Sequence, residues 1–514
     1  MKINKLNIIP PALLLAMSAL FSRVFGVVRD HLLAKTFGAT AGTGIYDLDV
    51  YYAAFRIPDM IYSLLVLGVV SAAFIPIFTK YKKDGDSQNA WKFASSMLHL
   101  MFLAILVISG VMYIFAPYLV HLIAGGFNAD QMELTTKLMR IMLISPILFS
   151  LTSVLVSIQD SFKTFLLRSL GPLFYNLGII IGIVYFGTKF GVVGVTWGVI
   201  IGALIQLIIQ LPSLKLVGYK HFWILGHRRQ DVQKAFKLII PRILGLSLTQ
   251  MTLVVNTLIA SFLMTGSITI FYLSDNLQAA PLGMVGIAFA ITSFATLSEL
   301  ASERDTQPFA NEIKKIVGKI LFLIIPITIG MLILRNQIID VILVYGKFTQ
   351  SDAVMTSKVL AALLISLFAQ SLIPLLARGF YAFQNTKTPL LTGFIGAVMS
   401  IGGSLLFALK FDLGIIGIAI AFSIGSIVNF ALLYILMSQK VKSDLLNWIN
   451  VFKIICMSTI MGSIVHIAKI LVPFEGGTIL QIILLLFYTV IGMVVYFGLA
   501  YILKMEEVEM IGRR

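Results

Sequence analysis

Long apolar segments, separated by short polar loops, follow one another along the whole chain. About fourteen of them reach the roughly 17–25 residues that a helix needs to cross a bilayer. Three segments, near 46–79, 268–298 and 355–382, are long or interrupted by Gly and Pro. The pattern predicts an all-α polytopic membrane protein with about fourteen transmembrane helices. The other predicted spans lie near 10–28, 93–115, 138–158, 168–187, 191–213, 236–263, 316–334, 389–409, 413–437, 451–471 and 478–503.

The composition agrees with this class of protein. Of the 514 residues, 59% are hydrophobic and 12% are charged, whereas soluble domains contain about 25% charged residues. No stretch is polar enough to form a separate soluble domain. Cys456 is the only cysteine, which excludes an intrachain disulfide and a thiolate metal cluster.

The basic residues predict the orientation of the chain. The apolar stretch from Ile8 to Leu20 lacks a small-residue cleavage site, so we expect it to be retained as the first helix, with the N-terminus in the cytoplasm. About 25 of the 39 Lys and Arg residues then lie on the cytoplasmic side, as the positive-inside rule requires. An even number of spans places Arg513 and Arg514 on the same side. No recognition motif accompanies the net charge of +16, so we expect no nucleic-acid binding.

A weak internal repeat divides the sequence. Four groups of residues return in the same order about 220 positions later, although apolar helices also resemble one another by chance. The repeat predicts two six-helix lobes at 1–215 and 216–440, related by a parallel repeat, and a final helix pair at 441–514. The matching groups are Tyr51-Tyr52 and Phe74 with Phe271-Tyr272 and Phe294, Gly126-Phe127 and Thr136-Lys137 with Gly346-Lys347-Phe348 and Ser357-Lys358, Gln159 and Lys163 with Gln384 and Lys387, and Gly191-Val192-Val193-Gly194 with Gly414-Ile415-Ile416-Gly417.

Charged residues inside the predicted spans are candidates for function, because each costs about 2.5–3.5 kcal/mol on the insertion scale. Arginine binds phosphate through a bidentate fork, so a polar, cationic cavity between the two halves would suit an anionic, phosphate-bearing headgroup. The candidates are Arg23, Arg29, Asp30, Asp47, Asp49, Arg56, Asp59, Arg242, Asp275 and Arg378.

Several of these residues have simpler interpretations. Arg29 with Asp30, and Arg56 with Asp59, are close enough in sequence to form local ion pairs at the membrane edge. Arg242 lies at a span end, where its side chain reaches the interface. Arg23 lies well inside the first predicted helix, which favours a role in the cavity. Asp275 could line the cavity, bind a cation or proton, or pair with an arginine.

No enzyme motif is present. The six histidines form no H-E-x-x-H pattern, and no P-loop occurs, since Val341 and Phe348 occupy its key positions around Gly346-Lys347. A membrane glycosyltransferase would need paired catalytic acids, and Asp47 and Asp49, the nearest match, have no supporting site. We therefore expect neither an enzyme nor a cofactor or metal.

Several motifs resemble those of the MurJ (MviN) family of lipid II flippases, over nearly the whole chain. They are FSRVFGVVRD at 21–30, DVYYAAFRIP at 49–58, SAAFIP at 71–76, YGKFT at 345–349, GFY at 379–381 and KTP at 387–389. The resemblance implies the multidrug/oligosaccharidyl-lipid/polysaccharide exporter fold, with a cationic cavity and a groove for a polyprenyl tail in the final helix pair. It also implies movement of lipid II, an undecaprenyl diphosphate bearing a disaccharide-peptide, to the outer leaflet by alternating access.

The resemblance also assigns candidate residues by position. Ser22, Arg23 and Arg29 match cavity residues, Asp49 matches a motif aspartate, and Asp275 matches an acidic residue of the eighth helix. We add Arg56 as a candidate that helps to bind the diphosphate. Because no ATP site is present, we expect the drive to come from the membrane potential or an ion gradient, with Asp275 coupled to cavity gating or to a cation.

The sequence departs from the family pattern where cationic residues are expected. Tyr62 and Ser63 stand where the pattern has two arginines, Leu67 where it has a glutamate, and Asn276 where it has an arginine. The cavity is therefore less cationic than in the family pattern. Two alternatives stay open: another polyprenyl-diphosphate-linked oligosaccharide as the substrate, or an ion-coupled small-molecule antiporter of the same fold.

Overall fold

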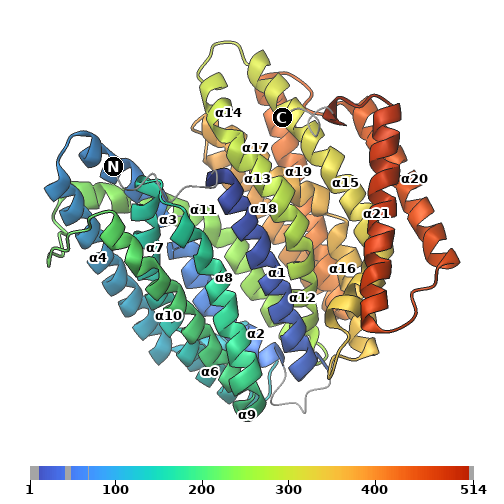
Figure 1. The fold of residues 1–514 in the computed structure, drawn as a ribbon, viewed down its shortest axis with the longest axis horizontal. Coiled ribbons are helices and arrows are strands. Elements are labelled where there is room, and N and C mark those ends of the chain that lie inside the picture. The colour runs from blue at the N-terminus through green and yellow to red at the C-terminus, as the bar shows by residue number, and fades with distance from the viewer. Residues whose placement is uncertain (1–10, 41–47, 67–68, 509–514) are drawn as a thin grey trace. The chain divides into compact units, whose positions relative to one another are not determined.

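The structure is a computed structural model that describes residues 11–40, 48–66 and 69–508, apart from the side chains of 11–16, 65–66, 69–72, 240–242 and 244–246. All regular elements in these ranges are helices, which confirms the predicted fold class (Figure 1). Asp47, Leu67, Arg513 and Arg514 lie outside the described residues, and so does the side chain of Arg242.

The helices group into two compact units. The first comprises Met1–Thr269 and Tyr345–Thr349, and the second comprises Ile270–Val344 and Gln350–Arg514. The predicted lobe limits at residues 215 and 440 stay a prediction, since they were drawn from the repeat and not from packing.

The elements up to residue 281 are α1 (Pro11–Phe37), α2 (Leu48–Ile61), the π-helix η2 (Tyr62–Val66), α3 (Val69–Lys83), α4 (Ser87–Ile114), α5 (Ala116–Ile123), α6 (Ala129–Met142), α7 (Ile144–Ser161), α8 (Leu166–Ile181), the π-helix η3 (Gly182–Gly187), α9 (Thr188–Phe190), α10 (Val192–Leu216), α11 (Gln230–Ser261) and α12 (Ser267–Pro281). The later elements are the π-helix η4 (Leu282–Ile287), α13 (Ala288–Thr292), α14 (Phe294–Leu300), α15 (Gln307–Leu343), α16 (Gln350–Leu364), α17 (Leu367–Ala382), α18 (Lys387–Ser404), the π-helix η5 (Leu405–Lys410), α19 (Gly414–Val441), α20 (Trp448–Leu471), α21 (Thr478–Ile502) and the 3-10 helix η6 (Glu506–Val508).

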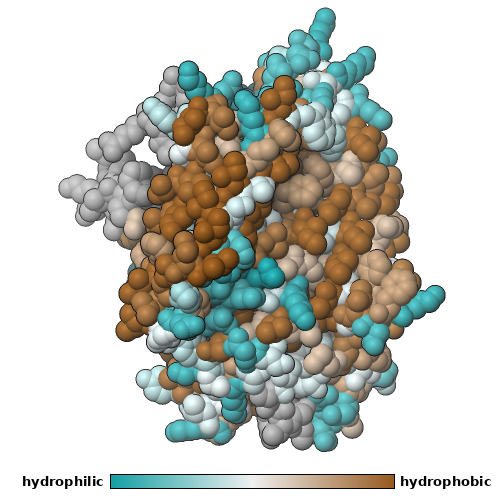
Figure 2. Space-filling model, turned by 90° about the vertical axis from the view of Figure 1, so that its right-hand side faces the viewer, coloured by the Kyte–Doolittle hydropathy of each residue, from teal (hydrophilic) through white to brown (hydrophobic). Residues whose placement is uncertain are grey.

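Ten helical stretches within the described ranges are long and apolar enough to cross a membrane. The pair α16 and α17, bent by 43°, adds an eleventh candidate. The count of fourteen stays a prediction, because the start of the first span and the break between η2 and α3 lie outside the described residues. The face that carries α20 and α21 shows broad apolar areas with hydrophilic patches between them (Figure 2). Ile467 and Ile470 of α20 and Val494 of α21 are exposed.

An aromatic cluster forms part of the core of the first unit. Phe74 and Phe78 of α3 stack at 5.2 Å between ring centroids, and Phe93 of α4 lies 5.2 Å from Phe74. Trp91 stacks on Phe162 at 5.9 Å, just after the end of α7. Because the rings of Phe74, Phe78, Phe93 and Trp91 are large and almost fully buried, and Phe162 packs against them half-buried, they fix the packing of α3, α4 and α7.

Glycines allow two helix pairs to approach closely. A Cβ on Gly178 of α8 would lie 2.2 Å from the Cα of Gly202 of α10, and a Cβ on Gly425 of α19 would lie 2.4 Å from the carbonyl oxygen of Gly396 of α18. Small residues at such crossings are how membrane helices gain close backbone contact. The same device therefore occurs in both units.

The repeat noted in the sequence coincides with matched local structure. Gly191 and Gly414 both have positive φ, at 60° and 55°, where α10 and α19 begin. The π-helix η5 precedes α19, and the π-helix η3 precedes α10 with the three-residue helix α9 between them. Lys163 and Gln384 share a left-handed φ of 57° and 56° in the turns after α7 and α17, so the turn pairs Lys163 with Gln384, whereas the repeat predicted from the sequence pairs Gln159 with Gln384. These positions need residues that tolerate positive φ.

Asp49 caps the start of α12. Its carboxylate accepts hydrogen bonds from the N–H of Gly266 (2.8 Å) and from the N–H and hydroxyl of Thr269 (2.7 and 2.6 Å). The N–H groups of a first helical turn lack intrahelical partners, and a negative charge there is favourable. Asp49 is only 3% exposed, so its buried carboxylate has a structural role.

The close approach of α8 and α10 predicts the effect of a single methyl group. Gly178→Ala should lower the melting temperature of the purified protein in detergent, because overpacking of this kind costs about 1–3 kcal/mol. Gly110→Ala on α4 is the matched control, since nothing lies within 4 Å of its added Cβ. Equal melting temperatures for the two variants would contradict the glycine contact.

The cap on α12 predicts that charge matters at residue 49. Asp49→Asn has the same size but one fewer acceptor oxygen and no charge, so the loss of a charged hydrogen bond should destabilise the protein by about 1.5–3 kcal/mol. Thermal unfolding in detergent measures this effect against Asp84→Asn, a substitution at an exposed loop residue. An unchanged melting temperature for Asp49→Asn would show that the cap contributes nothing to stability.

Candidate functional site

Arg29 is held by partners on two helices of the first unit. Its Nε and Nη2 donate to Oδ1 of Asp30 at 2.9 and 2.8 Å, and its Nη1 donates to Oδ1 of Asn176 of α8 at 3.1 Å. The amide of Asn176 in turn donates to the carbonyl oxygens of Pro172 (3.1 Å) and Ser22 (3.4 Å). The local ion pair with Asp30 is thus confirmed, and the link to Asn176 was not predicted.

Arg23 differs from Arg29. Its side chain is exposed, and it forms no hydrogen bond or ion pair with the described residues. Six residues of α-helix separate the two arginines by about 9 Å along the axis and about a third of a turn around it. Ser22 lies seven residues before Arg29 and so shares its face of α1. The sequence places the two guanidinium groups on adjacent faces of one helix.

Two other predicted site residues contact neighbouring helices. Arg56 of α2 donates from Nε to the hydroxyl of buried Thr257 of α11 at 2.8 Å. Asp49 accepts from the first residues of α12, as described above. Both side chains thus link α2 to the helices that follow in the first unit, a role that their spacing in the sequence does not indicate.

Asp275 lies in a row of polar side chains in the second unit. Its Oδ1 accepts from Nε2 of Gln278 at 3.0 Å. The hydroxyl of Ser366 accepts from Nε2 of Gln370 at 2.8 Å, at the bend between α16 and α17, and lies 3.0 Å from that of Ser423 of α19. Buried polar groups of this kind are costly unless they are bonded. The row therefore places an acidic residue in an environment that can stabilise it.

Tyr62 explains one of the departures from the family pattern. Its ring lies 4.8 Å from that of Phe149, which is itself 5.2 Å from Tyr175 of α8. These residues form a small apolar cluster with Ala203. An aromatic contact therefore occupies this position of the π-helix η2, where the pattern has a cation. Ser63 and Asn276 are half-buried.

The segment Tyr345–Thr349 contacts the end of α1. The N–H of Lys347 donates to the carbonyl oxygen of Lys35 at 3.0 Å, and the ring of Tyr345 packs edge-on against His31 at 4.8 Å. A Cβ on Gly346, which has a φ of 59°, would lie 2.3 Å from that carbonyl oxygen. The sequence predicts Lys347 only as a loop lysine. Gly346, the residue before it, is the one sequence feature that indicates a close contact here.

The chain matches a known family along most of its length. The family described as "Lipid II flippase MurJ" matches residues 33–487. A relative from Thermotoga maritima, named "Probable lipid II flippase MurJ", is 30% identical over 508 residues, which cover 98% of this chain and 99% of the relative. A relative of the same name from Vibrio cholerae is 32% identical over 443 residues and covers 83% of this chain and 82% of its own length.

Solved structures agree with these matches. The structure described as "Lipid II flippase MurJ, inward closed conformation" has a TM-score of 0.79 and 27% identity, and covers 96% of this chain and 98% of its own. A multidrug resistance MATE family transporter of the MOP superfamily, in an inward-facing conformation, has a TM-score of 0.70 at 15% identity, covers 82% of this chain and 94% of its own, and shares the fold alone. By sequence and fold, the chain belongs to the MurJ family of lipid II flippases.

Proposed function

We propose that this chain moves lipid II from the cytoplasmic to the outer leaflet of the bacterial inner membrane by alternating access. Both termini would lie in the cytoplasm. The observation that carries this proposal is the pair of arginines on α1, within a chain whose relatives are named as lipid II flippases. A flippase makes and breaks no covalent bond, so the residues need only bind, orient and release the lipid.

The diphosphate would be bound by Arg23 and Arg29. Arg23 has no partner among the described residues, and a cation within an apolar helix is favourable only when water or an anion compensates it. Arg29 is oriented by Asn176 and Asp30. A fixed guanidinium loses less freedom when it binds phosphate than a mobile one. Arg23 would thus supply the free charge and Arg29 the fixed one.

Ser22 and Arg56 would assist this site. Ser22 shares the face of α1 with Arg29, and its hydroxyl offers one donor. Arg56 donates from Nε to Thr257, which holds its guanidinium against α11, and its other N–H groups would assist in binding a phosphate. Asp49 would act on binding indirectly, by holding the start of α12.

Asp275 would couple transport to an ion or to gating. Its Oδ1 accepts a hydrogen bond from Gln278, whose own Oε1 lies 3.5 Å from Nε2 of Gln370, so polar side chains continue from Asp275 to α17. Movement of one charge through 100 mV is worth about 2.3 kcal/mol. The membrane potential or an ion gradient would therefore supply the drive.

A second substrate class follows from Tyr62. An aromatic cluster in place of a cation lowers the charge available to a diphosphate-linked glycopeptide and offers an apolar surface instead. Another polyprenyl-diphosphate-linked oligosaccharide is therefore the alternative substrate. An ion-coupled antiporter of the same fold is a weaker alternative, since α1 offers a free cation where a cationic drug would need an acid.

Complementation tests the proposed function and its site together. Wild-type protein should rescue a bacterium depleted of its own lipid II flippase. Arg23→Ala and Arg29→Ala should each fail at equal membrane expression, because removal of one charged phosphate contact costs about 2–5 kcal/mol. Arg228→Ala, at an exposed loop residue, is the matched control and should rescue fully.

The outcomes separate function from site. Rescue by both α1 variants would retain the function and discard the proposed diphosphate site. Failure of well-expressed wild type, together with rescue of a strain that lacks a different polyprenyl-linked glycan exporter, would establish the alternative substrate.

A further inference from the structure

The loop that joins α10 to α11 lies on the surface of the first unit and runs beside α4 (Figure 1). We call residues 219–228 the α10–α11 loop. From 221 to 227, exposed and half-buried residues alternate, with His221, Trp223, Leu225 and His227 exposed and Phe222, Ile224 and Gly226 half-buried. One side of the loop thus contacts the protein and the other is presented outward. None of these residues belongs to the α1 site, so the inference does not depend on the proposed function.

Hydrogen bonds from α4 hold the inner side of the loop. The hydroxyl of Ser95 accepts from the N–H of Phe222 at 3.1 Å and lies 3.2 Å from the hydroxyl of Tyr219. Nδ1 of His99 lies 2.8 Å from the carbonyl oxygen of Ile224, and only a protonated ring nitrogen can donate to that oxygen. The loop is therefore fixed on α4 at both ends of the segment that carries Trp223.

Trp223 stands at the outermost point of this segment. The N–H of Ile224 donates to the carbonyl oxygen of Phe222 at 2.9 Å, which places Trp223 at the centre of a three-residue turn. Its ring stacks on that of His99 at 5.7 Å and meets that of His221 edge-on at 4.7 Å. The residue is nevertheless 88% exposed, so a large aromatic ring is held outward on a rigid support.

The surface of α4 indicates the depth at which this ring lies. A row of exposed apolar side chains begins four residues after His99, and Lys92, whose Nζ lies 5.8 Å from the ring centroid of Phe222, precedes His99 by seven residues. His99 is therefore about 6 Å from the apolar row and about 10 Å from Lys92 along the helix axis. Trp223 thus lies at the boundary between them, where tryptophan is enriched in membrane proteins. The apolar row consists of Leu103, Leu106, Val107, Val111 and Ile114.

The loop and its flanks carry a surplus of positive charge. Residues 214–237 contain six Lys and Arg residues and one acid, Asp231, which pairs with Arg229 at 2.8 Å. Residues 80–92, which lead into α4, add four lysines and two aspartates. Lys215, Lys220 and Arg228 are exposed and form no ion pair within the described part of the chain. Such a surface complements an anionic partner.

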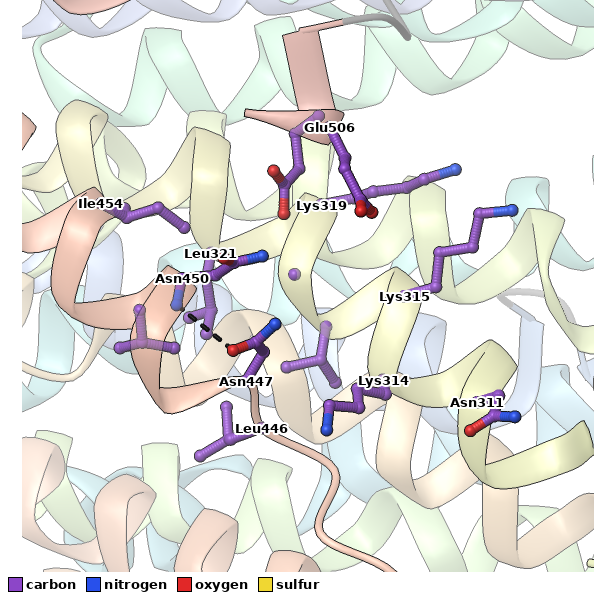
Figure 3. Close-up of a pocket in the computed structure, with 14 residues that line it drawn as sticks. Asn311, Lys314, Lys315, Lys319, Leu321, Leu446, Asn447, Asn450, Ile454 and Glu506 are labelled. Carbon is purple, nitrogen blue, oxygen red and sulfur yellow. Dashed lines mark hydrogen bonds between the residues drawn. The ribbon is translucent and has the colours of Figure 1, made fainter. Parts of the chain in front are cut away.

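The polar cavity among α15, α20 and η6 of the second unit has no comparable surplus. Lys314, Lys315 and Lys319 line it together with two glutamates, and Lys314 points away from the other two lysines (Figure 3). Lys314 also interacts electrostatically with Asp444. Three cations therefore meet three carboxylates there, whereas the α10–α11 loop keeps unpaired cations beside an exposed aromatic ring.

We propose that the α10–α11 loop is an anchor for the surface of the membrane. Trp223 and Leu225 lie among the lipid headgroups of the leaflet that the basic residues predict to be cytoplasmic. Lys215, Lys220 and Arg228 lie beside the phosphates of anionic phospholipids in that leaflet. Because the loop is fixed on α4, the anchor sets the depth of the first unit in the bilayer.

The fluorescence of Trp223 tests this placement directly. The chain has four tryptophans, so the variant Trp91→Phe, Trp197→Phe, Trp448→Phe retains Trp223 alone. In phosphatidylglycerol liposomes, lipid brominated near the headgroup should quench its emission at least about twofold more than lipid brominated near the end of the acyl chain. A matched variant that retains only Trp91, which is 6% exposed, should be quenched little by either lipid.

A neutral water-soluble quencher, acrylamide, tests the role of charge. In the single-tryptophan variant, the further changes Lys215→Gln, Lys220→Gln, Arg228→Gln should raise quenching of Trp223 by acrylamide at least about twofold, because the loop loses its attraction to the anionic surface. The matched changes Lys137→Gln, Lys189→Gln, Lys410→Gln, at exposed lysines elsewhere, should leave the quenching unchanged.

Each other outcome would overturn the proposal. Strong quenching by acrylamide with none by either brominated lipid would show that the loop lies in water and presents a surface for a protein. Equal quenching by the two brominated lipids would place the ring below the headgroups. Equal effects of the two sets of charge changes would remove the role of the loop's own cations. When the single-tryptophan variant does not fold, the difference in quenching between wild type and Trp223→Phe gives the same information.

Discussion

The hydrogen bonds that hold Arg29 are the contact on which the proposed site depends. A guanidinium within an apolar helix is stable only when its charge and its donors are satisfied. Asp30 supplies the charge, and Asn176 fixes the other end of the fork on α8. Because Asn176 also bonds to the backbone of α1 at Ser22, the two helices and the arginine form one hydrogen-bonded group.

The hydrogen-bonded group of Arg29, Asp30 and Asn176 depends on a fixed position of α8. The glycines of α8 and η3 meet those of α10 at backbone distance, and such crossings leave little room for α8 to move by itself. Arg23 has no such support, since it is exposed on the adjacent face of α1. One fixed arginine, Arg29, and one free arginine, Arg23, would together suit an anionic ligand that must be bound and then released.

The sequence was sufficient for the fold class, the family and the local pair of Arg29 with Asp30. Hydrophobic length predicts membrane helices directly, because a bilayer admits few other structures. The sequence was not sufficient for contacts between distant segments. Asn176, Thr257 and the segment Tyr345–Thr349 are far in the chain from the residues they contact, and no periodic pattern encodes such pairs. The aromatic contacts of Tyr62 were hidden for the same reason, although its departure from the family pattern was visible.

Transfer of lipid II across a bilayer is the central claim, and a leaflet assay with purified protein tests it most directly. Liposomes would carry fluorescent lipid II in both leaflets, and a membrane-impermeant quencher would be added outside. The account predicts that liposomes containing the protein lose the protected, inner-leaflet fraction of the signal over time, while protein-free liposomes retain it. Retention of that fraction by well-incorporated protein, under an imposed potential and under ion gradients of either direction, would contradict the account.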